Sequence, residues 1–438
     1  MLYRKIEKRI EEYFTNDTNK ILIIDGARQV GKSYIIRHIG KKFFPNYIEI
    51  NLLEDSINNK YFSNIRSIND FYLQVSMLAG DKLKDKNNTL IFLDEIQVYP
   101  ELLTLLKFLN QDNKYTFIAS GSLLGVTLSK TTSIPIGSIE VVHMYPLDFE
   151  EFLYANGFNE FSISLIKHKY EKYESLDNST HLRLLDLFKK YLLVGGLPDA
   201  INQYLDNYNI TNIRHIHSEI HEYYAMDASK YDSINRLKIR RIYDLIPSVL
   251  ENKKKRIVIK DIENIKGKRA SHYQDEFDYL INSGIVIDVK AISNPQFPLL
   301  ETASKNLIKM YLNDIGILTN ILYSNNIRAV LDDVKSINLG TVYESVVAQE
   351  LKAHNKKLFY YDNRHKGEVD FLIDDFNNLS ILPIEVKSGK DYTVHSALNK
   401  LLNDETYNIN KGYVLSNERE VIVKDKIIYL PIYYVMFI

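Results

Sequence analysis

The feature that most constrains the fold of this chain is the stretch Gly26-Ala27-Arg28-Gln29-Val30-Gly31-Lys32-Ser33. It fits the pattern G-x-x-x-x-G-K-[ST] at every fixed position. The apolar run 21–24 precedes it, and a helical pattern over residues 32–42 follows it. Glycines let the backbone pass close to phosphate oxygens, and the start of the following helix adds positive dipoles. The stretch therefore predicts a phosphate-binding loop between a buried strand and a helix.

The residue types in this loop predict ATP and Mg²⁺ as ligands. We expect Lys32 to reach the β- and γ-phosphates and the Ser33 hydroxyl to ligate Mg²⁺. The expected nucleotide-binding residues are Gly26, Ala27, Arg28, Gln29, Val30, Gly31, Lys32, Ser33 and Tyr34.

A second motif, Leu90-Ile91-Phe92-Leu93-Asp94-Glu95, places two acids directly after a buried strand. Ligands of open α/β sheets bind at the carboxyl ends of the strands. We therefore expect Asp94 to hold Mg²⁺ and Glu95 to take the proton from the attacking water. The next strand ends in Ser120-Gly121-Ser122. Ser120 is either a contact to the γ-phosphate or to that water, or part of a simple Ser-Gly turn. The predicted catalytic set for ATP hydrolysis is Lys32, Glu95 and Ser120.

The alternation of elements predicts an α/β fold. Apolar strands at 21–24, 47–51, 90–93 and 116–119 are separated by helical patterns, which is typical of a parallel sheet. Helical periodicity dominates after residue 146, and a second α/β pattern begins near residue 339. The predicted domains are a P-loop core over 1–147, a helical region over 148–229, a winged-helix-like module over 230–300 and a second, smaller α/β domain over 301–438.

Composition and charge narrow the classes of function. The 438 residues contain no Cys, which excludes disulfides, thiol catalysis and Cys-ligated metals. The net charge of −1 excludes a polybasic chain. Residues 230–290 are locally basic, with 14 basic and 9 acidic side chains. Two runs there, 253–256 and 266–269, either contact nucleic-acid phosphates or are solvated loops. There is no secretory h-region and no membrane-length apolar run, so we expect a cytoplasmic protein without membrane contact.

Several motifs in order resemble a known family. The loop over 26–33, Leu93-Asp94-Glu95-Ile96-Gln97 and the Ser120 turn resemble the AAA-type ATPases of prokaryotes that carry a DUF4143 region. The stretches 145–152, 191–198 and 311–316 resemble later motifs of that family. The resemblance implies an ATPase. One departure is Gly137-Ser138, where family members tend to have Gly-Arg. Arg236, Arg240 and Arg241 are alternative nucleotide-sensing arginines.

A second candidate site lies in the C-terminal α/β pattern. Asp370 and Glu385 fall on two expected strands, and two carboxylates on neighbouring strands can share a divalent metal such as Mg²⁺. Strand alternation puts Lys387 on the same face as Glu385, where it can act on water or on developing charge. Glu344 lies on a preceding helix. This set resembles the PD-(D/E)xK nuclease superfamily, which implies a restriction-endonuclease-like fold and a nuclease site made of Glu344, Asp370, Glu385 and Lys387.

These observations leave three functions open. The first is an ATP-hydrolysing switch whose nuclease-like domain binds or cuts DNA. The second is an ATP-regulated protein-interaction switch in which the nuclease-like fold is catalytically inactive, so that a protein replaces DNA as the partner. The third is a small-molecule kinase, although no acceptor-binding lid is evident.

Overall fold

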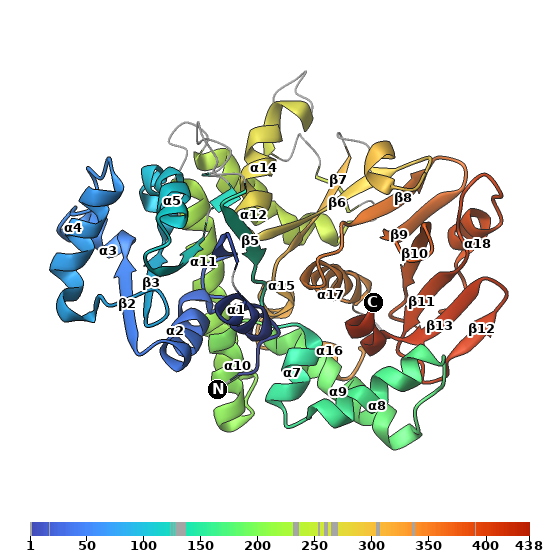
Figure 1. Cartoon of the computed structure of the whole chain (residues 1–438). Helices are drawn as coiled ribbons and strands as arrows, with labels where there is room; N and C mark the ends of the chain where they lie inside the picture. The colour runs from blue at the N-terminus through green and yellow to red at the C-terminus, as the bar shows by residue number, and fades with distance from the viewer. Residues whose placement is uncertain are drawn as a thin grey trace. The chain divides into compact units, whose positions relative to one another are not determined.

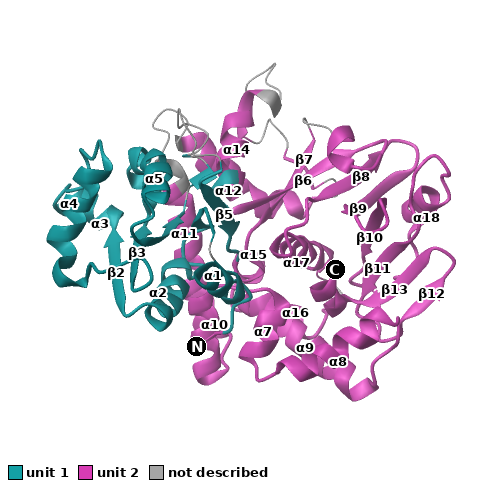
Figure 2. Ribbon diagram, in the orientation of Figure 1, with its two compact units in different colours: residues 1, 3–145, 282–284 teal, residues 2, 146–281, 285–438 magenta. Residues whose placement is uncertain are grey.

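The structure is a computed structural model that describes residues 2–16, 18–122, 124–125, 127, 137–230, 236–252, 255–257, 262–263, 270–303, 307–334, 337, 339–389 and 391–438. The chain forms two compact units (Figure 2). The first unit contains residues 3–145 and 282–284, and the second contains residues 146–281 and 285–438.

A five-stranded sheet forms the centre of the first unit (Figure 1). Its strands, in the spatial order β2-β3-β4-β1-β5, are β1 (Ile21–Asp25), β2 (Asn46–Asn51), β3 (Thr89–Asp94), β4 (Thr116–Gly121) and β5 (Ile139–His143). All neighbouring pairs are parallel, so the carboxyl ends of the strands lie at one edge. β1 and β3 are buried along their whole length, which explains their continuous apolar runs. The predicted parallel α/β sheet is confirmed.

Local sequence sets where the helices of the first unit begin. Ser67 and Asp70 form a reciprocal capping box at the start of α4, and Pro100 occupies the first turn of α5. The α-helices are α1 (Ile6–Thr15), α2 (Lys32–Phe43), α3 (Leu52–Asn58), α4 (Ile68–Ala79) and α5 (Pro100–Asp112), and the short 3₁₀ turns are η1 (Gly80–Lys82) and η2 (Ile96–Val98).

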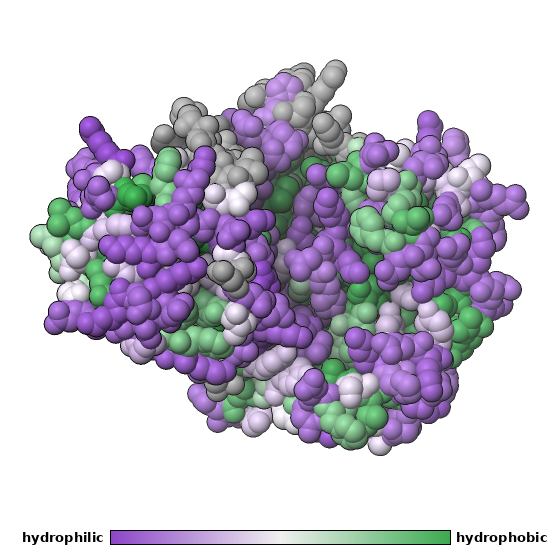
Figure 3. Space-filling view, viewed as in Figure 1, coloured by the Kyte–Doolittle hydropathy of each residue, from purple (hydrophilic) through white to green (hydrophobic). Residues whose placement is uncertain are grey.

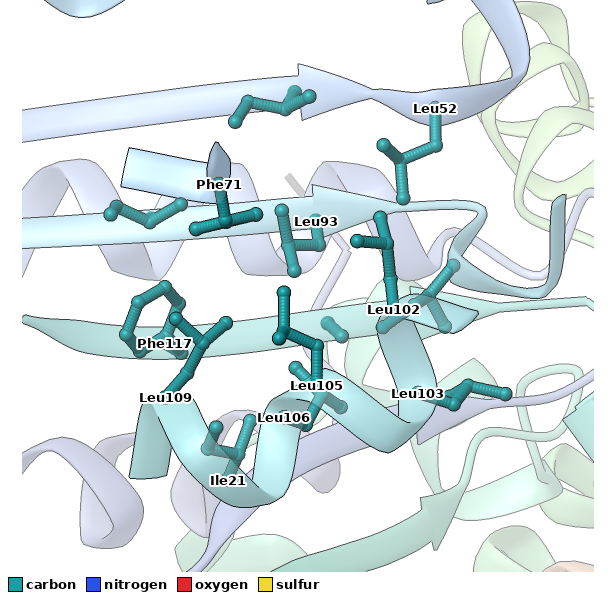
Figure 4. Packing of buried hydrophobic residues seen from close by; sticks show 14 of the residues in the cluster. Ile21, Leu52, Phe71, Leu93, Leu102, Leu103, Leu105, Leu106, Leu109 and Phe117 are labelled. Carbon is teal, nitrogen blue, oxygen red and sulfur yellow. The ribbon is translucent and has the colours of Figure 1, made fainter. Parts of the chain in front are cut away.

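The leucines of α5 pack that helix against the sheet (Figure 4). Leu102 and Leu106 pack in one buried cluster with Leu93 of β3 and Phe117 of β4, and each is at most 2% exposed. Truncating such a side chain to alanine typically costs about 2–5 kcal/mol. This packing holds β3 and β4, and therefore the residues at their carboxyl ends, in fixed positions.

Helices make up the first part of the second unit. A capping box between Asp148 and Glu151 starts the first of them, and Pro198 starts α10. The helices are α7 (Phe149–Ala155), α8 (Glu160–Glu171), α9 (Asn178–Val194), α10 (Pro198–Asn207), η3 (Thr211–Ile213), α11 (Arg214–Lys230), α12 (Arg236–Leu250), η4 (Ala270–Tyr273) and α14 (Gln274–Asn282).

A mixed sheet of eight strands organises the rest of the second unit (Figure 1). Its spatial order is β12-β13-β11-β10-β9-β8-β6-β7. The strands are β6 (Val286–Ile292), β7 (Ile308–Leu312), β8 (Phe359–Asn363), β9 (Gly367–Asp375), β10 (Ser380–Val386), β11 (Gly412–Ser416), β12 (Ile422–Lys424) and β13 (Ile427–Pro431). The helices along this part of the chain are η5 (Leu299–Thr302), α15 (Ile315–Tyr323), α16 (Arg328–Leu331), α17 (Gly340–Ala353), α18 (Ser396–Leu402) and η6 (Ile432–Phe437).

This sheet extends across the predicted domain boundary at residue 300. β6 was expected to close a winged-helix-like module, but it pairs antiparallel with β7 and parallel with β8. The boundary therefore runs between two hydrogen-bonded strands. The sheet of the second unit has eight strands, against five in the sheet of the first unit. Part of the predicted module, including residues 258–261 and 264–269, lies outside the described residues.

Large apolar side chains are scattered over the surface of the described residues. Hydrophilic residues cover much of the face shown in Figure 3. The exposed large apolar side chains come from separate elements, for example Leu73 of α4, Leu182 of α9 and Leu237 of α12, which is normal for a globular surface. No described helix is both long and apolar enough to cross a bilayer.

Candidate functional site

The loop after β1 needs glycine at both ends. Gly26 and Gly31 adopt φ values of +149° and +96°, which side chains rarely allow. A Cβ atom on Gly26 would lie 2.2 Å from the carbonyl oxygen of Met144. Arg4 donates a hydrogen bond to the Val30 carbonyl over 2.8 Å and thereby ties the loop to the chain before α1. The sequence therefore fixes a tight loop whose end is the first turn of α2.

Lys32 reaches back across this loop. It is 6% exposed, and its ammonium group donates to the carbonyl oxygens of Gly26 over 2.9 Å and Ala27 over 2.7 Å. Burial lowers the pKa of Lys32, although the carboxylates of Glu95, Asp25 and Asp94 favour its charged form. A buried ammonium group whose hydrogen-bond partners in the described structure are neutral carbonyls is well placed to bind phosphate oxygens instead.

Ser33, Asp94 and Ser120 come from three elements and meet at the carboxyl edge of the sheet. The Ser33 hydroxyl donates to Asp94 Oδ1 over 3.0 Å, and the Ser120 hydroxyl donates to the same oxygen. Burial raises the pKa of Asp94, and these two hydrogen bonds partly offset that effect. A hydroxyl and a carboxylate at this distance fit the oxygen ligands that Mg²⁺ prefers, with nucleotide oxygens and water as the rest of its shell. Bound there, Mg²⁺ would neutralise phosphate charge.

Glu95 is held in place by two side chains. It adopts φ +58° directly after β3, and its Oε2 accepts hydrogen bonds from Gln97 and, over 2.9 Å, from Ser122. Gln97 also donates to Ser122 over 3.1 Å, and Arg28 donates to Ser122 over 3.4 Å. The orienting roles of Gln97 and Ser122 were not predicted. The sequence feature that could have indicated these roles is the presence of polar residues just after two strands, Gln97 after β3 and Ser120-Gly121-Ser122 at the end of β4.

The remaining expected loop residues divide by exposure. Ala27 and Val30 are buried, whereas Gln29 is exposed and takes φ +65°. Tyr34 is 56% exposed, and its ring stacks on His38 within α2.

The second unit brings Asp370 and Glu385 onto neighbouring strands. β9 and β10 are antiparallel, and Ile384 pairs with Phe371, the residues directly next to Glu385 and Asp370. Asp370 Oδ2 accepts the Val386 N–H over 2.8 Å. Glu385 Oε1 lies 2.8 Å from Lys387 Nζ, whereas its buried Oε2 has no hydrogen-bond partner in the described structure.

Glu344 lies in α17, 3% exposed, and both of its carboxylate oxygens are occupied. Lys309 Nζ is 3.2 Å from Oε1, the Tyr311 hydroxyl donates to the same oxygen, and Lys255 donates to Oε2. Lys309 is fully buried and also lies 2.6 Å from Glu368 Oε1. Lys255, Lys309 and Tyr311 were missed as cluster residues, although a lysine inside the apolar strand Ile308–Leu312 was a signal.

The charges in this cluster perturb one another. Burial, with repulsion from Glu385 and Glu344, raises the pKa of Asp370 well above its usual value. Burial also raises the pKa of Glu385, which Lys387 partly offsets. Burial alone would raise the pKa of Glu344, but Lys309 and Lys255 more than compensate and lower it to about 2. The cluster thus holds acids in opposite electrostatic environments.

The first unit matches a known domain family. Residues 18–153 fit the model of an AAA domain, a span that includes the loop after β1, Asp94, Glu95 and Ser120. The chain contains an AAA domain. Residues 339–435 match a domain of unknown function, DUF4143, and residues 185–328 match another, DUF8612.

Two archaeal relatives resemble most of the chain. The uncharacterized protein MJ1544 of Methanocaldococcus jannaschii is 27% identical over 81% of this chain and 72% of its own length. The uncharacterized protein MJ1637 of the same organism is 24% identical over 98% of this chain and 87% of its own length.

Solved structures show weaker likeness. The Walker-type ATPase PABY2304 of Pyrococcus abyssi is 15% identical, covers 73% of this chain and 95% of its own, and has a TM-score of 0.45. The Aeropyrum pernix ORC1 protein in complex with DNA is 12% identical, covers 75% of this chain and 94% of its own, and has a TM-score of 0.31. At these scores the assignment of the AAA domain rests on the family model and on the sheet described above.

Of the three arginines considered as nucleotide sensors, Arg240 and Arg241 have other partners. Ser138, which stands at the departure from the family motif, accepts the Ile21 N–H at the start of β1 through its carbonyl. In the second unit, Arg240 lies 2.7 Å from Glu222, and Arg241 donates to the Ile262 carbonyl over 2.6 Å. The side chain of Arg236 lies outside the described residues.

Three further motifs of the resemblance meet in the second unit and serve its packing. The Gly196 N–H donates to Asp314 Oδ2 over 2.6 Å, and the Leu147 N–H donates to the Gly196 carbonyl over 2.7 Å. A Cβ on Gly196 would lie 2.1 Å from the Leu147 carbonyl oxygen. These contacts give the motifs around 146, 196 and 314 a structural explanation.

The expected nuclease residues do not fit a metal ion as they stand. Within the described ranges, no group of three or more His, Asp or Glu side chains is arranged to hold one. Ammonium groups contact Glu344 and Glu385 where a cation would bind. The described residues of the first basic run, 253–256, form ion pairs with acidic side chains. Lys255 contacts Glu344, and Arg256 lies 2.5 Å from Asp362. Lys253, Lys254 and the second run, 266–269, lie outside the described residues.

Proposed function

We propose that this protein binds Mg²⁺–ATP in its AAA domain and hydrolyses the γ-phosphate as a molecular switch. The observation that carries the proposal is the meeting of Ser33, Asp94 and Ser120 at the sheet edge beside the loop that Lys32 spans. Each of these groups comes from a different element, and each supports the same ligand.

In this proposal each side chain has a separate role in binding or hydrolysis. Lys32 exchanges its carbonyl partners for β- and γ-phosphate oxygens and offsets the charge that develops there. Ser33 and Asp94 are the protein groups suited to hold Mg²⁺. Glu95, oriented by Gln97 and Ser122, accepts the proton of the attacking water. Ser120 positions Asp94 through its hydrogen bond.

Product analysis tests this proposal. The full chain is incubated with ATP and Mg²⁺, and the release of inorganic phosphate is measured. Release of free phosphate supports hydrolysis. Phosphate that appears instead on an added metabolite makes the protein a kinase, and no turnover in any condition rejects the proposal.

A second candidate function is binding and Mg²⁺-dependent cleavage of DNA by the second unit. The observation that favours it is that Asp370 accepts the Val386 N–H on the neighbouring strand, directly after Glu385, with Lys387 Nζ 2.8 Å from Glu385 Oε1. Cleavage of a panel of linear and branched DNAs, with and without Mg²⁺, tests it. DNA binding without cleavage would show that the second unit is a DNA-binding domain and not a nuclease. If DNA is neither bound nor cleaved, the remaining hypothesis is an ATP-regulated contact with a protein partner.

A further inference from the structure

An open cavity of about 540 Å³ lies in the second unit, between α10, the start of α11 and the end of α15. The nine described residues that line it are all polar: four carry side-chain amides, three carry hydroxyls, and the other two are Arg214 and His215. This described lining contains no acid and no apolar side chain. Sites for apolar ligands are lined mostly by hydrophobic and aromatic side chains. The lining of this cavity therefore indicates a polar ligand.

Arg214 is a buried cation with unsatisfied hydrogen-bond donors. It is 4% exposed, and its Nη1 atom donates to the Leu193 carbonyl over 3.1 Å. The same atom makes two longer contacts, to Thr319 Oγ1 over 3.3 Å and to the Gly316 carbonyl over 3.4 Å. The Nε and Nη2 atoms are buried and have no hydrogen-bond partner in the described structure. Buried donors without acceptors are unfavourable, so the guanidinium group has two donors available for a ligand.

The charge of Arg214 has no counter-ion among the described residues. Burial lowers the pKa of Arg214 to about 10, and no described carboxylate offsets this effect. The nearby His217 is neutral, because burial, reinforced by the charge of Arg214, lowers the pKa of His217 to about 3. Buried charges in proteins are normally paired, since an unpaired one is costly. An anion that enters the adjoining cavity would supply the missing partner.

The free donors and the rest of the lining define the class of anion. Nε and Nη2 form one edge of the planar guanidinium group, and such an edge binds two oxygens of a phosphate or a carboxylate at once. The cavity lies at the amino-terminal end of α11, where the helix dipole also favours negative charge. A phosphate has a further oxygen that can accept a hydrogen bond from His215. The amides and hydroxyls of the lining, such as Gln203 and Asn325, match the hydroxyl groups of a sugar.

We propose that this cavity binds a small phosphorylated sugar, whose phosphate group is held by the Nε–Nη2 edge of Arg214. On binding, the guanidinium group gives up its two longest contacts, to Thr319 and Gly316, and turns toward the cavity. The residues of the cavity all belong to the second unit and lie within the region 185–328 that matches DUF8612. The site is therefore additional to the ATP site proposed for the AAA domain.

Isothermal titration calorimetry of the full chain with ribose 5-phosphate tests the proposal. Every protein carries Lys32→Ala, so that the loop of the AAA domain does not take up the phosphate of the probe. Ribose 5-phosphate should bind once per chain and more tightly than inorganic phosphate or ribose. Arg214→Lys keeps the charge but lacks the two-donor edge, and it should weaken this binding about 10- to 100-fold. No binding of ribose 5-phosphate, or the same affinity for inorganic phosphate or in Arg214→Lys, overturns the proposal.

A surface variant tests the same site without changing a buried residue. Asn325 lines the cavity and is exposed, so Asn325→Asp adds a negative charge there at nearly constant side-chain size. Repulsion of the phosphate should weaken the binding of ribose 5-phosphate about 10-fold. Asn377→Asp adds the same charge at an exposed position outside the lining and should leave the affinity unchanged. Equal affinities of Asn325→Asp and Asn377→Asp for ribose 5-phosphate overturn the proposal.

Discussion

The Ser33 hydroxyl lies 3.0 Å from Asp94 Oδ1, although 61 positions separate the two residues in the sequence. β4 lies between the strands that lead to them, and Ser120 at its end donates to the same carboxylate oxygen. The parallel sheet thus brings a loop, an acid and a hydroxyl to one place. That convergence is what makes the AAA domain a candidate for Mg²⁺–ATP hydrolysis.

Glu95→Gln should separate nucleotide binding from hydrolysis. The amide cannot accept the proton of water, so phosphate release should fall by about 10²–10⁴-fold. ATP affinity should stay near the wild-type value because Lys32 and the loop are untouched. Glu101→Gln, an exposed acid in the first turn of α5, is the matched control. Wild-type turnover by Glu95→Gln would remove Glu95 from the mechanism.

Gly196→Ala should strongly destabilise the second unit. The added Cβ would lie 2.1 Å from the Leu147 carbonyl oxygen, which is backbone and has little freedom to move. Backbone shifts of this kind typically cost about 1–3 kcal/mol or more. Gly389→Ala is the control, because no atom lies within 4 Å of its added Cβ, and its effect should stay within about 0.5 kcal/mol. Chemical denaturation measures both, and equal stability of the two variants would contradict the packing described here.

Asp314 should make the second unit less stable as the pH rises from 4 to 6. Burial raises the pKa of Asp314 from its usual 3.8 to about 6, despite hydrogen bonds from Gly196, Ile317 and Gly316. Between these values the folded state keeps a proton that the unfolded state has released, so the free energy of unfolding falls by roughly 2 kcal/mol from pH 4 to pH 6.

Calorimetric Tm values of the wild type and Asp314→Asn at pH 4 and pH 6 isolate this contribution. The amide does not titrate, so Asp314→Asn should lose less stability than the wild type between the two pH values. Asp332→Asn, at an exposed position, should follow the wild type. Parallel behaviour of all three proteins would show that Asp314 does not titrate in this window.

The sequence predicts the first unit well because its signals are local. The loop motif and the buried runs of β1, β3 and β4 indicate the sheet directly. β5 was not predicted, since Ile139–His143 is half-buried to exposed and lacks a continuous apolar run. The roles of Gln97 and Ser122 depend on the approach of two loops, which periodicity along one segment does not report.

In the second unit, local sequence patterns predict most strands but not how distant strands pair. Most strands after residue 358 were predicted, but the pairing of β6 with β8 joins residues such as Lys290 and Phe359. Strand pairing over such a separation leaves no periodic signal in either segment. The contacts of Lys255 and Lys309 with Glu344 could not be predicted for the same reason, because the tertiary fold brings these residues together from distant parts of the sequence.

Phosphate release by Lys32→Ala tests the central claim most directly. The substitution removes the buried ammonium group that spans the loop, so ATP binding and Mg²⁺-dependent hydrolysis should both be lost. Lys41→Ala, an exposed lysine on the same helix, should retain wild-type turnover. Loss of activity in Lys32→Ala alone is the predicted result. Hydrolysis by Lys32→Ala at the wild-type rate would contradict the account.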